Sequence, residues 1–160
     1  MQNFQRDLMF LLHDVARLMR VDADKRARAH GMTRAQWGIL IWLERQAGLS
    51  QKELAEILEV EPITVARLID RLEGRGMVER RPDPKDRRIW RLHLCKPAYP
   101  VLREIDRQRE EMRLLVTHGL DEPTIETMTE ALLAMKTTLT HEIHPLRRYA
   151  PADAEAREIA

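Results

Sequence analysis

The sequence predicts a mainly helical protein with one small β-hairpin near its middle. Over most of the 160 residues, apolar side chains recur every three or four positions, as they do on the buried face of a helix. Only residues 77–94 change to a period of two, which is typical of half-buried strands. Apolar residues make up 44% of the chain, enough for a core, and the length favours one compact unit or two small lobes.

The N-terminal segment is predicted to form one long amphipathic helix from about Phe4 to His30, ended by Gly31. Its apolar residues repeat at steps of three and four: Leu8, Leu11, Leu12, Val15, Leu18 and Met19. Thr33 and Gln36 then form a capping box, in which two side chains satisfy free backbone N–H groups at a helix start. A second helix therefore begins after Thr33.

Two short helices joined by a tight turn are predicted next. Ser50 and Glu53 form a second capping box, and Pro62 stands where proline is favoured, in the first turn of a helix that stops at Gly74 to Gly76. Such a pair is a helix-turn-helix, whose second helix can enter the DNA major groove, which is about 12 Å wide.

The second of these helices carries the residues expected to contact base edges. Those predicted to face outward are Ile63, Thr64, Arg67 and Arg71. Arg67 can donate two hydrogen bonds to one guanine, and Thr64 can touch a thymine methyl group or a phosphate. The alternative is that the arginines form ion pairs with Asp70 or Glu73 on the same helix.

The predicted hairpin, residues 77–94, has a charged turn that carries two prolines. Asp86, Arg87 and Arg88 lie at its tip, where an arginine could enter a narrow minor groove. Asp86 could hold the Arg88 guanidinium in one pose, although the alternative is an ordinary surface ion pair. Contacts with the DNA backbone are expected from a separate set of residues: Ser50, Gln51 and Lys85.

Two further helices are predicted after the hairpin. Pro97 and Pro100 begin a long helix that Gly119 ends, and Asp121 caps the last one. The apolar residues of the last helix form a heptad seam: Ile125, Met128, Leu132, Met135 and Leu139. A seam of this kind requires a partner, either the long helix of the same chain or a second copy. Residues 144–160 lose the pattern and are predicted to form a frayed tail.

Charge and cysteine content exclude several classes of protein. The 27 basic and 26 acidic residues almost balance, but residues 62–91 hold nine basic against five acidic side chains. No apolar run reaches the roughly 18–20 residues of a membrane span, and we find no secretory signal. A single cysteine, Cys95, excludes an intrachain disulfide. These features predict a soluble cytoplasmic protein.

Five segments resemble the winged helix of MarR-family transcriptional regulators, in order and at the family's spacing: Ser50-Gln-Lys-Glu-Leu-Ala55, Val60-Glu-Pro-Ile-Thr-Val65, Arg67-Leu-Ile-Asp-Arg-Leu-Glu73, Gly76-Met-Val-Glu-Arg80 and Asp86-Arg-Arg88. The resemblance covers residues 30–94 and implies a winged helix-turn-helix core plus a helical dimerisation lobe built from both chain ends. It also implies a homodimer that binds a palindromic operator and often represses the target gene. One departure is Leu94-Cys-Lys-Pro-Ala98, where the family usually has Leu-Thr-x-x-Gly.

The same resemblance assigns domains and a ligand site. It places residues 1–32 and 97–143 in the dimerisation lobe and residues 33–96 in the DNA-binding domain. Three residues look like ligand-binding positions of the SlyA-like branch, suited to a small aromatic carboxylate: Arg17, Arg20 and Trp37. The alternative is a tryptophan of the core, with arginines paired to Asp14 or Asp24.

The sequence therefore predicts a DNA-binding transcriptional regulator, most simply a homodimeric repressor released by an aromatic acid. The alternative is a winged-helix module that binds protein and no specific DNA. We find no nucleophile–base pair, phosphate loop or cysteine–histidine cluster, so neither an enzyme nor a cofactor is expected. His141 and His144 are spaced by three and do not fit the zinc-protease motif. Cys95 is interpreted as an inert thiol rather than a redox sensor.

Overall fold

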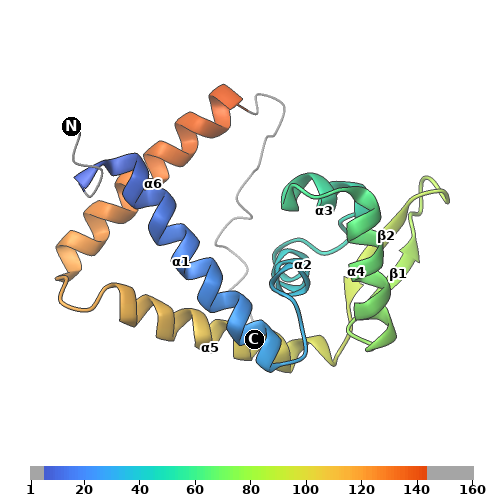
Figure 1. Ribbon diagram of the computed structural model, residues 1–160. Coiled ribbons are helices and arrows are strands. Elements are labelled where there is room, and N and C mark those ends of the chain that lie inside the picture. Colours follow the sequence, from blue (N-terminus) through green and yellow to red (C-terminus); the bar gives the residue numbers. More distant parts are fainter. Residues whose placement is uncertain (1–5, 144–160) are drawn as a thin grey trace, which may run out of the picture. The chain divides into compact units, whose positions relative to one another are not determined.

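The computed structural model describes residues 6–143, and within them it has six helices and two strands (Figure 1). The elements in chain order are α1 (Leu8–Ala29), α2 (Arg34–Arg45), α3 (Gln51–Leu58), α4 (Pro62–Gly74), β1 (Val78–Pro82), β2 (Trp90–Leu94), α5 (Ala98–Val116) and α6 (Glu122–Ile143). This is the predicted fold class. The predicted tail, residues 144–160, lies outside the described residues.

The helix starts follow from their capping residues. The backbone N–H of Phe10 donates to the Asp7 carboxylate over 2.8 Å, so α1 begins at Leu8, later than the periodicity alone predicts. Both predicted capping boxes are present, one on Thr33 at the start of α2 and one on Ser50 at the start of α3. Gly31 adopts a φ of +64°, which favours glycine, directly after α1.

The chain forms two compact units, residues 1–108 and 109–160. The core of the first unit collects apolar side chains from α2, α3, α4, both strands and the first half of α5; its largest fully buried members are Ile39, Leu40, Leu43, Leu54, Ile69, Leu72, Leu92 and Ile105. Ala27 of α1 also belongs to this core. The division between the two units falls inside α5, and Ala98, Leu102 and Ile105 are buried in the core of the first unit.

A two-stranded antiparallel sheet, referred to below as the wing, follows α4. Val78 pairs with Leu94 at its base and Pro82 with Trp90 toward its tip. The segment before α3 runs along β2: Gly48 N–H donates to Leu92 O, and Leu92 N–H donates to Leu49 O, each over 2.9 Å. These bonds fix the wing to the start of the helix-turn-helix.

The second unit contains the end of α5 and the whole of α6. Asp121 accepts a hydrogen bond from Thr124 N–H over 3.1 Å and caps α6, as predicted. The predicted seam residues lie at the surface of the single chain: Leu132 is 47% exposed, and Met128 and Leu139 are exposed to a similar degree. None of the described helices is long and apolar enough to cross a membrane.

Candidate nucleic-acid interface

The turn between α3 and α4 sets the direction of α4. Glu59 ends α3 in the left-handed conformation, with a φ of 55°, and Pro62 occupies the first turn of α4. Leu54 of α3 and Val65 and Ile69 of α4 are buried in the same core. One face of α4 is therefore fixed against α3, and the opposite face is left for contacts.

The outward face of α4 consists of the four residues predicted to contact bases. Ile63 is 62% exposed, and Thr64, Arg67 and Arg71 are also exposed. Neither Arg67 nor Arg71 has an ion-pair or hydrogen-bond partner among residues 6–143. Their guanidinium groups are therefore available to a ligand or partner.

Arg80 of β1 explains why these arginines are unpaired. Its guanidinium lies 2.6 Å from the Asp70 carboxylate and also binds the Glu73 carboxylate. Both acids were candidate partners for Arg67 and Arg71 in the sequence, but the structure engages them with Arg80 instead. A residue of the wing thus neutralises the acids of α4 and leaves the basic groups on its outer face unpaired.

Asp83 organises the turn of the wing. Its buried carboxylate accepts hydrogen bonds from Arg91 Nε over 2.7 Å, from Lys85 N–H over 2.7 Å and from Asp86 N–H over 3.0 Å. The bond from Arg91 is the main reason that the pKa of Asp83 falls to about 2, and the two backbone bonds add to it. The turn is therefore held by an ionised carboxylate.

The tip of the wing carries one held and one unpaired arginine. Arg88 donates from Nε and Nη2 to the Asp86 carboxylate over 3.0 and 2.9 Å, the pairing expected from the sequence. This pairing lowers the pKa of Asp86, while the Arg88 side chain stays 90% exposed. Arg87 is exposed and has no partner in the described part of the chain. Both guanidinium groups can be presented to a groove.

Arg91 links the wing to α3, a role that the sequence analysis missed. Besides Asp83, its guanidinium donates to Glu53 Oε2 over 3.0 Å and to Gly48 O over 3.2 Å. Burial raises the pKa of Glu53, but hydrogen bonds from Ser50 and the charge of Arg91 outweigh this, and the net pKa is lowered. The same Glu53 completes the Ser50 capping box, so one ion cluster positions both the wing and the start of α3.

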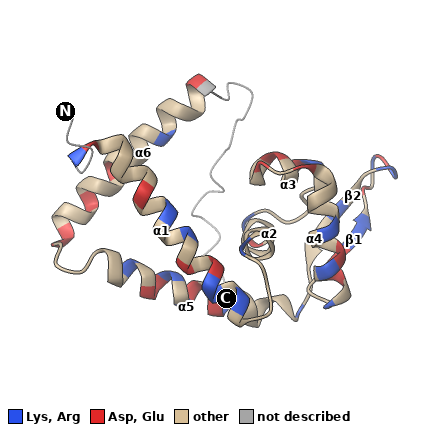
Figure 2. Ribbon diagram, in the orientation of Figure 1, with Lys and Arg blue, Asp and Glu red and all other residues tan. Residues whose placement is uncertain are grey.

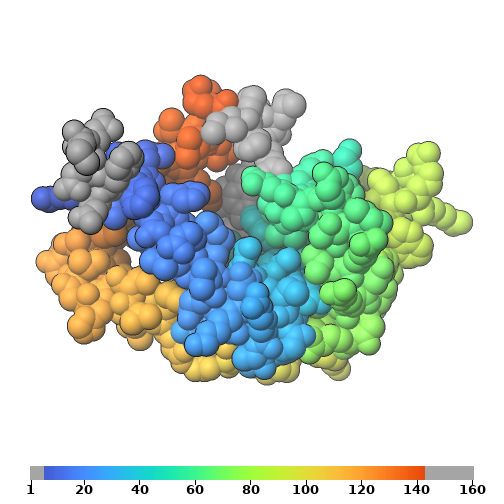
Figure 3. Space-filling model, in the orientation of Figure 1, coloured from blue at the N-terminus to red at the C-terminus, as the bar shows by residue number. Residues whose placement is uncertain are grey.

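The candidate backbone contacts surround this cluster. Ser50 and Gln51 are half-buried at the start of α3, and Lys85 is exposed in the turn of the wing. α4 carries two basic and two acidic residues, and α3 carries Glu53 and Glu56 against Lys52 (Figure 2). The wing has more basic than acidic residues. The wing projects from the body of the first unit (Figure 3). Duplex DNA is a polyanion with two grooves. A projecting basic hairpin beside a helix with unpaired arginines is suited to bind it.

Residues 30–89 match the model of the MarR family. The match spans α2, α3, α4 and β1. Three solved structures with the same fold are MarR (27% identity, 84% of this chain and 98% of that chain, TM-score 0.71), the transcriptional regulator SlyA (24%, 84% and 95%, 0.73) and a MepR–DNA complex from S. aureus (23%, 84% and 98%, 0.68). These comparisons show a fold that the chain shares with the three structures and a family match confined to residues 30–89. They do not single out the SlyA-like branch.

The three predicted ligand residues have different surroundings in the structure. Trp37 is only 5% exposed, its ring lies 6.0 Å from that of His30, and its indole N–H has no partner among the described residues. Arg20 precedes His30 by ten residues, about 15 Å along a helix. Arg17 donates to Asp14 over 2.6 Å, the alternative pairing that the sequence allowed. Arg20 is exposed on α1.

Cys95 is half-buried at the end of β2. Burial is the main cause that raises the pKa of its thiol, and nearby Glu79 raises it further. A raised pKa reduces the thiolate fraction at neutral pH, and thiolate is the reactive form. This environment agrees with the interpretation of Cys95 as an inert thiol. Within residues 6–143 there is no cluster of metal-binding side chains; His144 lies outside this range.

The turn of the wing is expected to lose stability in acid. The pKa of an aspartate in an unfolded chain is about 4, and that of Asp83 is lowered to about 2. Its stabilising contribution is therefore complete above pH 4 and is lost as the pH falls from about 4 to 2. We expect the free energy of unfolding of the natural protein to fall more steeply over this range than that of Asp83→Asn, measured by urea unfolding. Equal pH dependence in both proteins would show that Asp83 does not hold the turn.

Proposed function

We propose that this protein is a transcriptional regulator of the MarR family, a dimeric repressor that binds a specific palindromic DNA site. The observation that carries the proposal is the unpaired outward face of α4. Arg80 engages Asp70 and Glu73, so Arg67 can form two hydrogen bonds with a guanine. The MepR–DNA complex, which shares this fold, supports the use of the winged helix on DNA.

Each subunit would contact two grooves. The N-terminal half of α4 would enter the major groove, where Ile63, Thr64 and Arg67 meet base edges. The wing would follow the backbone to the adjacent minor groove, where Arg87 or Arg88 inserts into the narrow, electronegative space. Ser50, Gln51 and Lys85 would contact phosphates and fix the register.

A homodimer accounts for the exposed seam of α6. Met128, Leu132 and Leu139 of the seam are apolar and solvent-exposed in the single chain, and burying them against a second copy would be favourable. A two-fold dimer presents two copies of α4, so its site would be a palindrome with half-sites about 10 base pairs apart.

Selection from a pool of randomised duplexes tests the proposal. Purified full-length protein should enrich a two-fold symmetric sequence over successive rounds. An Arg67→Ala and Arg87→Ala double variant, carried through in parallel, should enrich none. Recovery of unrelated sequences by the natural protein would contradict specific DNA recognition.

The second candidate function is a protein-binding winged helix. It is favoured by the exposed apolar residues Ile63, Ile89 and Trp90 on α4 and the wing. DNA binding and protein binding differ in their response to salt, because each phosphate contact releases counterions. A protein-binding surface would show no tight complex with any duplex.

Release by a small aromatic carboxylate is proposed for the Arg17, Arg20 and Trp37 region. A tenfold weakening of operator binding requires that the acid prefer the non-binding state by about 1.4 kcal/mol. We expect benzoate-type acids to shift the DNA-binding curve of the natural protein, measured by fluorescence anisotropy. Arg20→Ala should reduce the shift, and an equal shift in that variant would exclude Arg20 from the site.

A further inference from the structure

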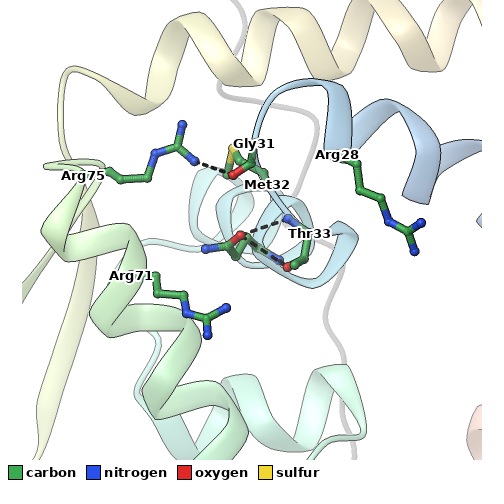
Figure 4. Close-up of a pocket in the computed structure, with 7 residues that line it drawn as sticks. Arg28, Gly31, Met32, Thr33, Arg71 and Arg75 are labelled. Atoms are coloured by element: carbon green, nitrogen blue, oxygen red, sulfur yellow. Dashed lines mark hydrogen bonds between the residues drawn. The ribbon is translucent and has the colours of Figure 1, made fainter.

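A hollow of about 490 Å³ lies in the first unit between the α1–α2 connection and α4. Arg28 comes from the last turn of α1, and Arg71 and Arg75 come from the C-terminal end of α4. Figure 4 shows Arg71 and Arg75 extending from α4 toward the segment that holds Gly31 and Thr33. The hollow falls within the 300–1,000 Å³ that is usual for small-molecule sites.

The lining of this hollow carries three guanidinium groups and no carboxylate. Arg75 donates one hydrogen bond to Gly31 O over 3.2 Å, which holds the side chain across the hollow. Arg28 and Arg71 have no ion pair or hydrogen bond within residues 6–143. Three uncompensated positive charges around one space favour a bound anion.

Gln36 supplies an independent observation. It lines the same hollow and is only 4% exposed. Its side-chain carbonyl accepts the hydrogen bond from Thr33 N–H over 2.9 Å, which fixes which end of the amide is oxygen. The NH₂ end has no hydrogen-bond partner within residues 6–143, and it is not among the fully buried polar atoms, so it can donate into the hollow. The hollow therefore offers an inner amide donor as well as guanidinium donors at its rim.

We propose that this hollow binds an oxyanion, a phosphate or carboxylate group. Guanidinium donors match the spacing of such oxygens, and the Gln36 NH₂ adds a hydrogen bond from the inner wall. Met32, which is buried, supplies apolar lining. The group can belong to a free small molecule or to the DNA backbone. The site shares Arg71 with the outward face of α4 but does not include Ile63, Thr64 or Arg67. Binding of a free anion does not depend on the proposed DNA-binding function.

The sharpest variant is Gln36→Glu. The carboxylate keeps the oxygen that caps α2, and capping boxes accept Glu as readily as Gln. It replaces the inner NH₂ donor by a second, negatively charged oxygen. Gln46→Glu, at the exposed C-terminal end of the same helix, is the matched control for added charge. Arg28→Ala removes one guanidinium group from the rim of the hollow and leaves the capping box of α2 unchanged. Arg103→Ala is its matched control.

The first arm of the experiment uses the full chain and no DNA. Sodium phosphate replaces sodium chloride at constant ionic strength, and binding is followed by calorimetry and by the thermal unfolding midpoint. The natural protein and both control variants should bind phosphate and gain thermal stability. Gln36→Glu should weaken binding by at least about tenfold, because a hydrogen bond to a charged group is replaced by repulsion. Arg28→Ala should weaken it by a smaller factor.

The second arm measures duplex binding at several salt concentrations. If the hollow takes a DNA phosphate, Gln36→Glu should reduce the slope of log affinity against log salt by about 0.9, the value of one phosphate contact. An unchanged slope together with phosphate binding in the first arm assigns the site to a free anion. The proposal is overturned if Gln36→Glu leaves both free-phosphate binding and the slope as they are in the natural protein. Loss of all duplex binding by the natural protein would count against the proposed function alone, because the first arm contains no DNA.

Discussion

Replacing Arg67 with alanine is expected to weaken binding to the selected operator by roughly 5- to 150-fold, which corresponds to about 1–3 kcal/mol. The side chain is exposed on the outer face of α4 and unpaired within residues 6–143, so its removal breaks no contact of the free protein described there. Val65 and Ile69 remain buried, and the fold should keep its stability. The binding free energy lost in Arg67→Ala would therefore measure the contact of Arg67 with DNA.

The loss of affinity caused by Arg67→Ala should be compared between the operator and a random duplex. Fluorescence anisotropy should show a large loss on the operator and a smaller one on random DNA. Arg67→Lys keeps the charge but not the two-pronged donor, so it should restore non-specific binding and not specificity. Arg103→Ala, an exposed arginine away from α4, should change neither affinity. Equal losses on both duplexes would show that Arg67 contacts a phosphate rather than a base.

Replacing Leu132 with aspartate is expected to separate the dimer. Leu132 lies in the middle of the seam on α6, and a charge there would have to be buried without a partner in the dimer interface. Sedimentation should shift from a species of twice the chain mass of 18.8 kDa to one of that mass. Affinity for a full palindrome should fall toward that for a half-site, because two linked contacts become one.

Thr137→Asp is the matched control for this substitution, since it adds the same charge on the opposite face of α6. It should remain dimeric, and circular dichroism should show that both variants stay helical. An intact dimer of Leu132→Asp would show that the seam is not the interface between copies.

The parts of the fold that depend on neighbouring residues were predictable from the sequence. The two capping boxes join residues three apart, and both predicted helix starts are confirmed. The hairpin predicted over residues 77–94 is also present, with strands at Val78–Pro82 and Trp90–Leu94. Pro82 still pairs with Trp90 although it lacks an N–H. The start of α1 was predicted too early, since periodicity does not show that Asp7 caps the helix.

The ion pairs that shape the candidate site could not be predicted in the same way. Arg91 bonds to Glu53 across 38 positions of sequence, and Arg80 to Asp70 across ten. Such pairs depend on how the wing packs against α3 and α4, and each acid had a nearer basic residue as a plausible partner. The burial of Trp37 likewise depends on how α2 packs in the core.

Binding of the natural protein to the selected palindrome, compared with a scrambled duplex of the same composition, tests the central claim most directly. Titrations at two salt concentrations should give an affinity for the palindrome at least about 10³-fold higher, and both affinities should fall steeply as salt rises. Equal affinity for the two duplexes, or binding that does not respond to salt, would contradict base recognition by α4.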